Sequence, residues 1–125
     1  MSRRRIRVLV VDDQAPFLRA ARAVLDEASG FELIAEATSG EEAVAAARAL
    51  EPELVLMDVN MPGIGGVEAT RRIVSARPET IVVLLSSYED APVEADGSGA
   101  AVYIPKGEFG RRELAEVWRA HGPKR

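Results

Sequence analysis

The chain has 125 residues, of which 47% are hydrophobic, no cysteine and a formal net charge of −4. This length suits one domain that buries its own core without disulfides. No apolar run approaches the ~18 residues of a membrane span and no secretory pattern opens the chain, so we expect a cytoplasmic protein that does not enter a membrane. The acidic balance argues against direct nucleic-acid binding, and arginines 3–5 are expected to form a solvated tail.

Continuous apolar runs predict the strands. They cover residues 6–11, 31–37, 54–57 and 81–85, and a shorter fifth strand is expected at 101–104. Such runs, without polar alternation, are typical of strands that are buried on both faces, as in a parallel sheet with helices on each side.

Two helices are predicted between the first three strands. Pro16 suits a first helical turn, and apolar residues then recur at helical spacing until Gly30 (Phe17, Leu18, Ala21, Val24 and Leu25). Ser39 and Glu42 have the form of a capping box before the second helix, which Pro52 closes.

The later units are less regular. A third helix is expected at residues 67–76, and a last helix from about 109 to 120. Between the fourth and fifth strands, Pro92, Gly97 and Gly99 confine any helix to a turn or two. The pattern is five βα units, the fourth of them shortened.

Acidic side chains lie at the ends of two predicted strands: Asp12 and Asp13 after the first, and Asp58 after the third. In an open doubly wound sheet the ligand crevice lies at the carboxyl ends of the strands, where Ser86 and Lys106 also fall. Like charges about 4 Å apart repel by roughly 4 kcal/mol at an effective dielectric of 20, so the acids need a compensating cation. Oxygen ligands favour Mg²⁺, with Mn²⁺ as an alternative, over zinc.

A carboxylate can also attack phosphorus when a metal and a second cation neutralise the phosphoryl oxygens. Lys106 can supply that cation, and the Ser86 hydroxyl a further donor. Plainer interpretations stand beside this one. Asp12 or Asp13 can cap the first helix, Asp58 can be a turn residue, Lys106 a solvated loop residue, and Ser87 can replace Ser86.

Four motifs then carry a resemblance to a known family. They are Val11-Asp12-Asp13, Met57-Asp58 followed by Asn60-Met61-Pro62-Gly63, Leu84-Leu85-Ser86, and Tyr103-Ile104-Pro105-Lys106. In this order they resemble the CheY-like receiver (phosphoacceptor) domain of two-component response regulators, over almost the whole chain. Residues 12–14, 40–43 and 65–68 are most similar to receivers of the LuxR/NarL-type regulators.

The resemblance implies a flavodoxin-like (βα)5 sandwich with strand order 2-1-3-4-5. Residues 1–125 would be a single receiver domain with an ordered core of about 5–121 and no output domain. Asp58 would accept a phosphoryl group from a sensor histidine kinase or a phosphotransfer protein. Asp12, Asp13, Asp58 and the backbone carbonyl of Asn60 would hold the Mg²⁺.

The resemblance also implies a switch. Lys106 and Ser86 would contact the phosphoryl group, and Tyr103 would follow Ser86. Asn60 and Tyr88 match positions that tune dephosphorylation. The domain would be a signalling switch that phosphorylates itself from donors, not an enzyme with its own substrate. We expect a homodimer through the last helix and strand, and regulation of transcription if a DNA-binding output domain follows in a longer chain.

Two departures from the family pattern remain. Gly107 follows Lys106 where many receivers place proline, which leaves the isomer of that peptide bond open. The interval from Ser86 to Lys106 is short for a receiver, so the surface that signals the output is in doubt. Two alternatives also stay open: a phosphohydrolase that forms an aspartyl phosphate, and a degenerate receiver that serves only in protein contact.

Overall fold

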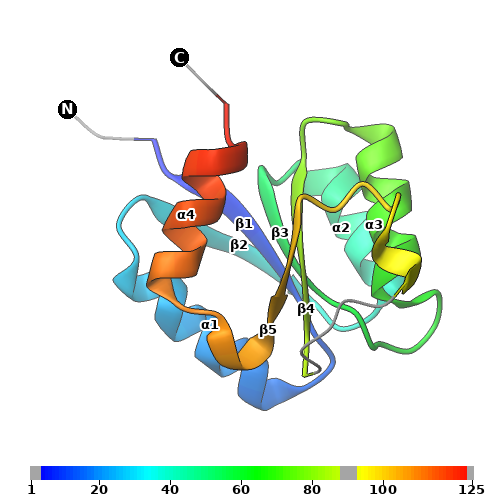
Figure 1. Cartoon of the computed structure of the whole chain (residues 1–125), viewed down its shortest axis with the longest axis horizontal. Coiled ribbons are helices and arrows are strands. Elements are labelled where there is room, and N and C mark those ends of the chain that lie inside the picture. The colour runs from blue at the N-terminus through cyan, green and yellow to red at the C-terminus, as the bar shows by residue number, and fades with distance from the viewer. Residues whose placement is uncertain (1–3, 88–92, 124–125) are drawn as a thin grey trace.

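Five parallel strands form the centre of the molecule, which is a computed structural model that describes residues 4–87 and 93–123 (Figure 1). The strands are β1 (Ile6–Val11), β2 (Phe31–Ala37), β3 (Leu54–Asp58), β4 (Ile81–Ser86) and β5 (Val102–Pro105). They pair in the order β2-β1-β3-β4-β5, all in parallel. The predicted flavodoxin-like order is confirmed.

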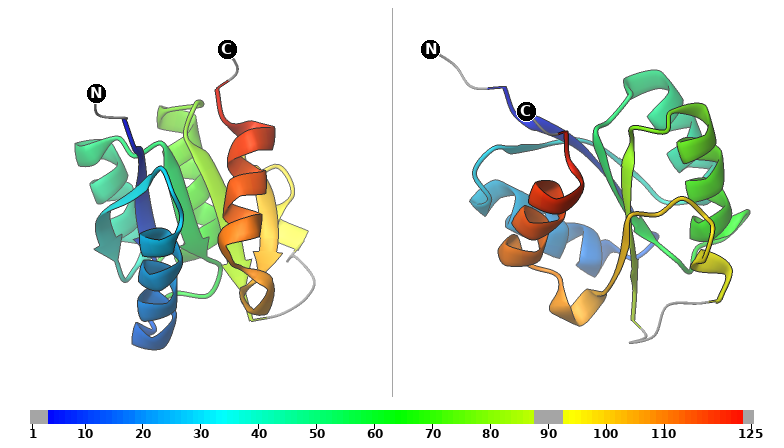
Figure 2. Two further views of the ribbon diagram at one scale, coloured as in Figure 1. Left: turned by 90° about the vertical axis from the view of Figure 1, so that its left-hand side faces the viewer. Right: turned by 45° about the horizontal axis from the view of Figure 1, so that its top comes forward.

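Helices cover both faces of the sheet (Figures 1 and 2). On one side lie α1 (Ala15–Glu27) and α4 (Arg111–His121), and on the other α2 (Gly40–Leu50) and α3 (Gly65–Ala76). The strand residues divide between the two layers by alternation: Val8 and Val10 pack with α1 and α4, whereas Leu9 and Val11 pack on the opposite face. Burial on both faces explains the unbroken apolar runs.

Local sequence signals set the helix boundaries, with small shifts from the prediction. Ser39 caps α2 by accepting the Glu42 backbone N–H at 3.1 Å. The reciprocal half of the capping box is displaced by one residue, because the Glu42 carboxylate accepts the N–H and hydroxyl of Thr38 instead. At the other end of the chain, α4 begins at Arg111, since residues 106–108 form a separate 3-10 turn, η2 (Lys106–Glu108).

The fourth unit is shortened, as predicted. Within its described part, residues 93–101, the only helical element is the 3-10 turn η1 (Val93–Ala95). Gly97 and Gly99 have positive φ values of 74° and 97°, which a continuing helix excludes. Arg71 of α3 donates to the Glu94 carbonyl at 3.1 Å and so ties this segment to the neighbouring helix.

The structure also bears on the Lys106–Gly107 peptide bond and on membrane spans. All described peptide bonds are trans, that between Lys106 and Gly107 included. Among the described residues, none of the helices is both long and apolar enough to span a bilayer.

Candidate functional site

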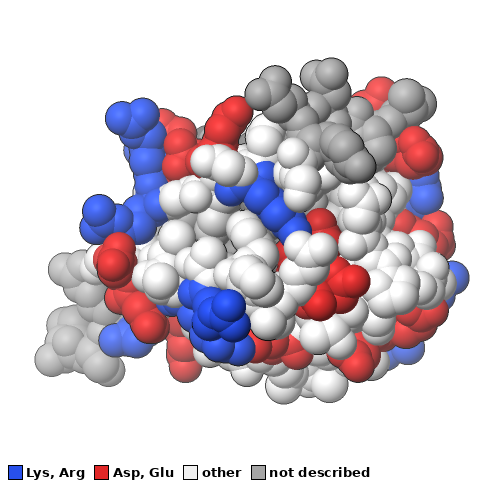
Figure 3. All heavy atoms as spheres, turned by 90° about the horizontal axis from the view of Figure 1, so that it is seen from below, with Lys and Arg blue, Asp and Glu red and all other residues white. Residues whose placement is uncertain are grey.

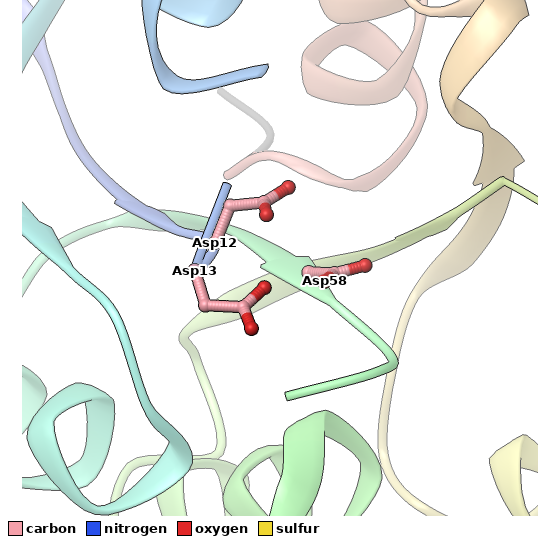
Figure 4. Close-up of side chains that lie close together, drawn as sticks. All are labelled: Asp12, Asp13 and Asp58. Atoms are coloured by element: carbon pink, nitrogen blue, oxygen red, sulfur yellow. The ribbon is translucent and has the colours of Figure 1, made fainter. Parts of the chain in front are cut away.

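The ends of β1 and β3 bring three carboxylates together (Figure 4). Asp12 and Asp13 follow β1 directly, and Asp58 is the last residue of β3, the neighbouring strand. One carboxylate oxygen from each lies within 4.8 Å of the others. Asp12 and Asp58 are buried, whereas Asp13 is exposed at the mouth of the group. The predicted convergence at the carboxyl edge of the sheet is therefore present.

Lys106 reaches this group from the edge strand β5, which lies two strands along the sheet from β3. It begins η2, immediately after β5, and its side chain is only 14% exposed. The Lys106 Nζ lies 2.6 Å from Asp12 Oδ2 and 3.4 Å from Asp58 Oδ1. Figure 3 looks onto the end of the sheet where β4 finishes, and acidic and basic side chains adjoin in the middle of that face. One ammonium thus serves two buried carboxylates.

The electrostatics of Asp58 follow from this crowding. Burial, with the nearby Asp12 charge as the second cause, raises the pKa of Asp58 from 3.8 to about 6. The Lys106 ammonium and the hydrogen bond from the Asn60 backbone N–H act in the opposite direction and are outweighed. The site therefore carries more negative charge than its own lysine neutralises.

The donors of this group fit a hard divalent cation. All are carboxylate oxygens, and the described residues include no cysteine near them. Asp12 Oδ1 accepts the Gln14 backbone N–H at 2.9 Å. Asp12 Oδ2 is buried, and within the described residues its close polar partner is the Lys106 ammonium, in an ion pair. A buried carboxylate oxygen whose one close partner is a cationic ammonium, beside the exposed carboxylate of Asp13, is suited to bind a further cation.

The loop after β3 is fixed close to Asp58. A Cβ on Gly66 would lie 1.9 Å from the Asp58 carbonyl oxygen, so this position of α3 excludes a side chain. Val59 donates to the Leu85 carbonyl at 2.8 Å, and Glu41 of α2 accepts the Ile64 N–H at 3.4 Å. Sequence reasoning did not single out Glu41, whose place in the first turn of a capped helix gave no sign of this contact.

The remaining predicted residues lie around this edge. Ser86 ends β4 and is buried, whereas Ser87 is exposed. The sequence left the choice between the two hydroxyls open, and this difference in burial favours Ser86. Tyr103 lies in β5 opposite Leu84 and is half-buried against the α2–α3 layer of the core. Asn60 is exposed, and Tyr88 lies outside the described residues.

The sequence did not predict the contact between Lys106 and Phe17. The Lys106 Nζ lies 4.8 Å from the ring centroid of Phe17, in the first turn of α1. The sequence marked Phe17 only as part of the apolar face of a helix. Its one further signal is that it comes four residues after Asp13, near the start of the helix that follows the two acids.

A flavodoxin-like sheet with acids and a lysine at its carboxyl edge matches the class that the sequence motifs indicate. The family described as the response regulator receiver domain matches residues 8–119. The chain therefore belongs to the response regulator receiver domain family.

Relatives agree with this assignment. The chain is 41% identical over 116 residues to the response regulator GacA of Pseudomonas viridiflava, which covers 91% of this chain and 54% of GacA. It is 38% identical over 122 residues to the response regulator UvrY of Escherichia coli (strain K12), covering 96% and 56%. The chain thus spans about half the length of the curated relatives it matches.

Solved structures show the same fold. A two-component response regulator of the LuxR family from Aurantimonas sp. SI85-9A1 aligns with a TM-score of 0.82 at 28% identity, over 93% of this chain and 84% of that one. The response regulator domain of Thermotoga maritima CheB aligns with a TM-score of 0.80 at 32% identity, over 98% and 100%. The resemblance to CheY-like and LuxR/NarL-type receivers is confirmed.

Proposed function

We propose that Asp58 accepts a phosphoryl group from the phosphohistidine of a sensor histidine kinase or a phosphotransfer protein. The observation that carries the proposal is the convergence of Lys106 Nζ on both Asp58 and Asp12 at the carboxyl edge of the sheet. In the transfer, the N–P bond of the donor breaks and an Asp58 oxygen forms the new bond to phosphorus. The imidazole nitrogen leaves with the electron pair and takes up a proton.

The other residues of the site would hold the metal ion or neutralise the phosphoryl oxygens. Asp12, Asp13, Asp58 and the Asn60 carbonyl would hold Mg²⁺, or Mn²⁺ in its place, which supplies positive charge to the phosphoryl oxygens. Lys106 neutralises Asp12 in this structure, at 2.6 Å. A cation held on Asp12 would take over this neutralisation, and the Lys106 ammonium could then contact the phosphoryl group. Asp58 attacks as the carboxylate, so with a pKa of about 6 it is mostly ionised at neutral pH before any metal binds.

Phosphorylation adds up to about two negative charges next to an already acidic group. Ser86 and Tyr103 are the residues proposed to respond. Ser86 is buried at the end of β4, one residue past Leu85, which pairs with Asp58. Tyr103 packs on the layer that holds α2 and α3. An inward movement of Ser86 opens room for Tyr103 and changes this surface. Asn60 and Tyr88 are proposed to tune the loss of the phosphoryl group.

The output is proposed from the relatives. This chain spans about half the length of the matched response regulators, and structural neighbours include LuxR-family regulators. We infer that the switch controls transcription through an attached output domain. The edge strand β5 and α4 border a cavity of about 280 Å³, and this side is the proposed homodimer contact. Sedimentation before and after phosphorylation tests the dimer.

The direct test offers an acyl phosphate with Mg²⁺ and measures intact mass. The parent protein is expected to gain one phosphoryl group, and Asp58→Asn none. Excess EDTA should also prevent the gain. No adduct on the parent would favour a degenerate receiver, and rapid turnover of varied phosphoesters would favour a phosphohydrolase. A gain that survives Asp58→Asn would mean that another residue is the acceptor.

A further inference from the structure

The Lys106 ammonium is bounded by an aromatic ring as well as by carboxylates. Its Nζ is 2.6 Å from Asp12 Oδ2 and 3.4 Å from Asp58 Oδ1, and 4.8 Å from the Phe17 ring centroid. The carboxylates attract the ammonium hydrogens, and the face of the ring attracts its positive charge. Lysine has a long flexible side chain, so a third contact restricts the positions that its ammonium can occupy.

The ring is itself held in place. Phe17 lies in the first turn of α1, beside Pro16, and packs against Phe109 with ring centroids 6.2 Å apart and an angle of 52° between the rings. Phe109 directly follows η2, the turn that Lys106 begins, and its N–H donates to the Lys106 carbonyl at 3.2 Å. Both phenylalanines are half-buried against the α1–α4 layer of the core. The backbone turn and the ammonium of Lys106 are thus held by one aromatic pair.

An aromatic ring suits this position better than a further acid would. Two buried carboxylates already contact Lys106, with Asp13 beside them, and another would add repulsion and compete for the ammonium hydrogens. The ring holds the cation without accepting a conventional hydrogen bond or adding charge. The hydrogens of Lys106 stay available for carboxylate or phosphoryl oxygens.

We propose that Phe17 is a positioning residue for Lys106, holding the ammonium beside Asp12 and Asp58 and so setting the rate of phosphoryl transfer. This inference rests on the proposed function of Asp58 and goes beyond it, because it assigns to α1 a part in the chemistry. Phe17 touches no reacting atom and acts only through Lys106.

The test measures the rate of phosphoryl uptake from an acyl phosphate at saturating Mg²⁺. Phe17→Leu keeps an apolar side chain but removes the ring, and we expect uptake to slow roughly three- to thirtyfold, the range that corresponds to one cation–π contact. Phe17→Tyr keeps the ring and should restore most of the parent rate. Phe31→Leu is the matched control, since Phe31 is a buried phenylalanine of the same core layer on β2. It should lower stability without slowing uptake.

A double-mutant cycle separates positioning from packing. In a Lys106→Met background, Phe17→Leu should cause no further slowing, because the group on which the ring acts is gone. Circular dichroism confirms folding, and Phe17→Met replaces the leucine variant if that variant does not fold. Equal rates for the parent, Phe17→Leu and Phe17→Tyr would overturn the inference while leaving the proposed function intact. So would an equal slowing with and without Lys106. A parent chain that takes up no phosphoryl group would refute the proposed function, and the positioning role with it.

Discussion

Replacing Asp58 by asparagine is expected to stabilise the metal-free protein at neutral pH and to change nothing in acid. The folded protein holds the pKa of Asp58 at about 6, against 3.8 as the ordinary value. The folded state therefore binds the Asp58 proton more tightly than the unfolded chain. Stability from this group is fully present below pH 3.8 and is lost as the pH rises through about 6.

The difference between the two pKa values sets the size of the effect. About two pKa units correspond to about 3 kcal/mol at most, and screening by solvent near the exposed Asp13 reduces this to about 1–3 kcal/mol. Asparagine resembles the protonated acid in shape and lacks the charge. The Asp58→Asn protein should therefore not lose stability as the pH rises through this range. The two proteins should have equal stability near pH 4 and should diverge up to pH 7.

Urea unfolding with EDTA at pH 4 and pH 7.5 measures this difference. Asp26→Asn, which removes an exposed carboxylate of α1 far from the site, is the control and should give the same small difference at both pH values. Adding Mg²⁺ at pH 7.5 should favour the parent, because a bound cation stabilises the ionised carboxylate. An Asp58→Asn protein that is less stable than the parent at pH 7.5, or a difference independent of pH, would refute the reasoning about burial and charge.

Three further substitutions, one of them with a matched control, test other contacts by urea unfolding. Lys106→Met leaves two buried carboxylates without their cation and should cost about 3 kcal/mol at pH 7.5 in EDTA, with Mg²⁺ recovering part of it; no loss would contradict the ion pairs. Gly66→Ala places a Cβ against the Asp58 carbonyl and should cost about 1–3 kcal/mol or more, whereas Gly107→Ala, with nothing within 4 Å of its Cβ, should cost little. Ser39→Ala removes the cap of α2 and should cost about 1 kcal/mol; an unchanged midpoint would show that Glu42 and Thr38 suffice.

The strands and the acidic group could be predicted because each depends on a short-range sequence pattern and one topological rule. Unbroken apolar runs such as that of β1 identify buried parallel strands, and parallel strands bring their carboxyl ends to one edge. The four residues of the site all lie at or directly after such ends, so their meeting could be predicted without knowledge of packing: Asp12, Asp13, Asp58 and Lys106.

The details that escaped prediction depend on where individual side chains reach. The contact of Phe17 with Lys106 depends on the angle at which α1 packs on the sheet and on the turn η2 that carries the lysine toward α1. The partner of Glu42 shifted to Thr38 because Thr38 offers two donors together. Such side-chain contacts depend on which residues become neighbours in the folded structure, and no periodicity in the sequence predicts them.

The shortened fourth unit has a consequence for the opening motions of the domain. In the described part of the chain, strand β5 is at the edge of the sheet and pairs only with β4, through four residues from Val102 to Pro105, whereas β1 is paired on both sides. No α-helix occurs in the described part of the crossover that leads into β5. Backbone amides of β5 should therefore exchange with solvent hydrogen faster than those of β1. Since Lys106 follows β5 directly, each opening of this edge would carry the lysine away from Asp58, and the local stability of one short strand would limit how long the site stays assembled.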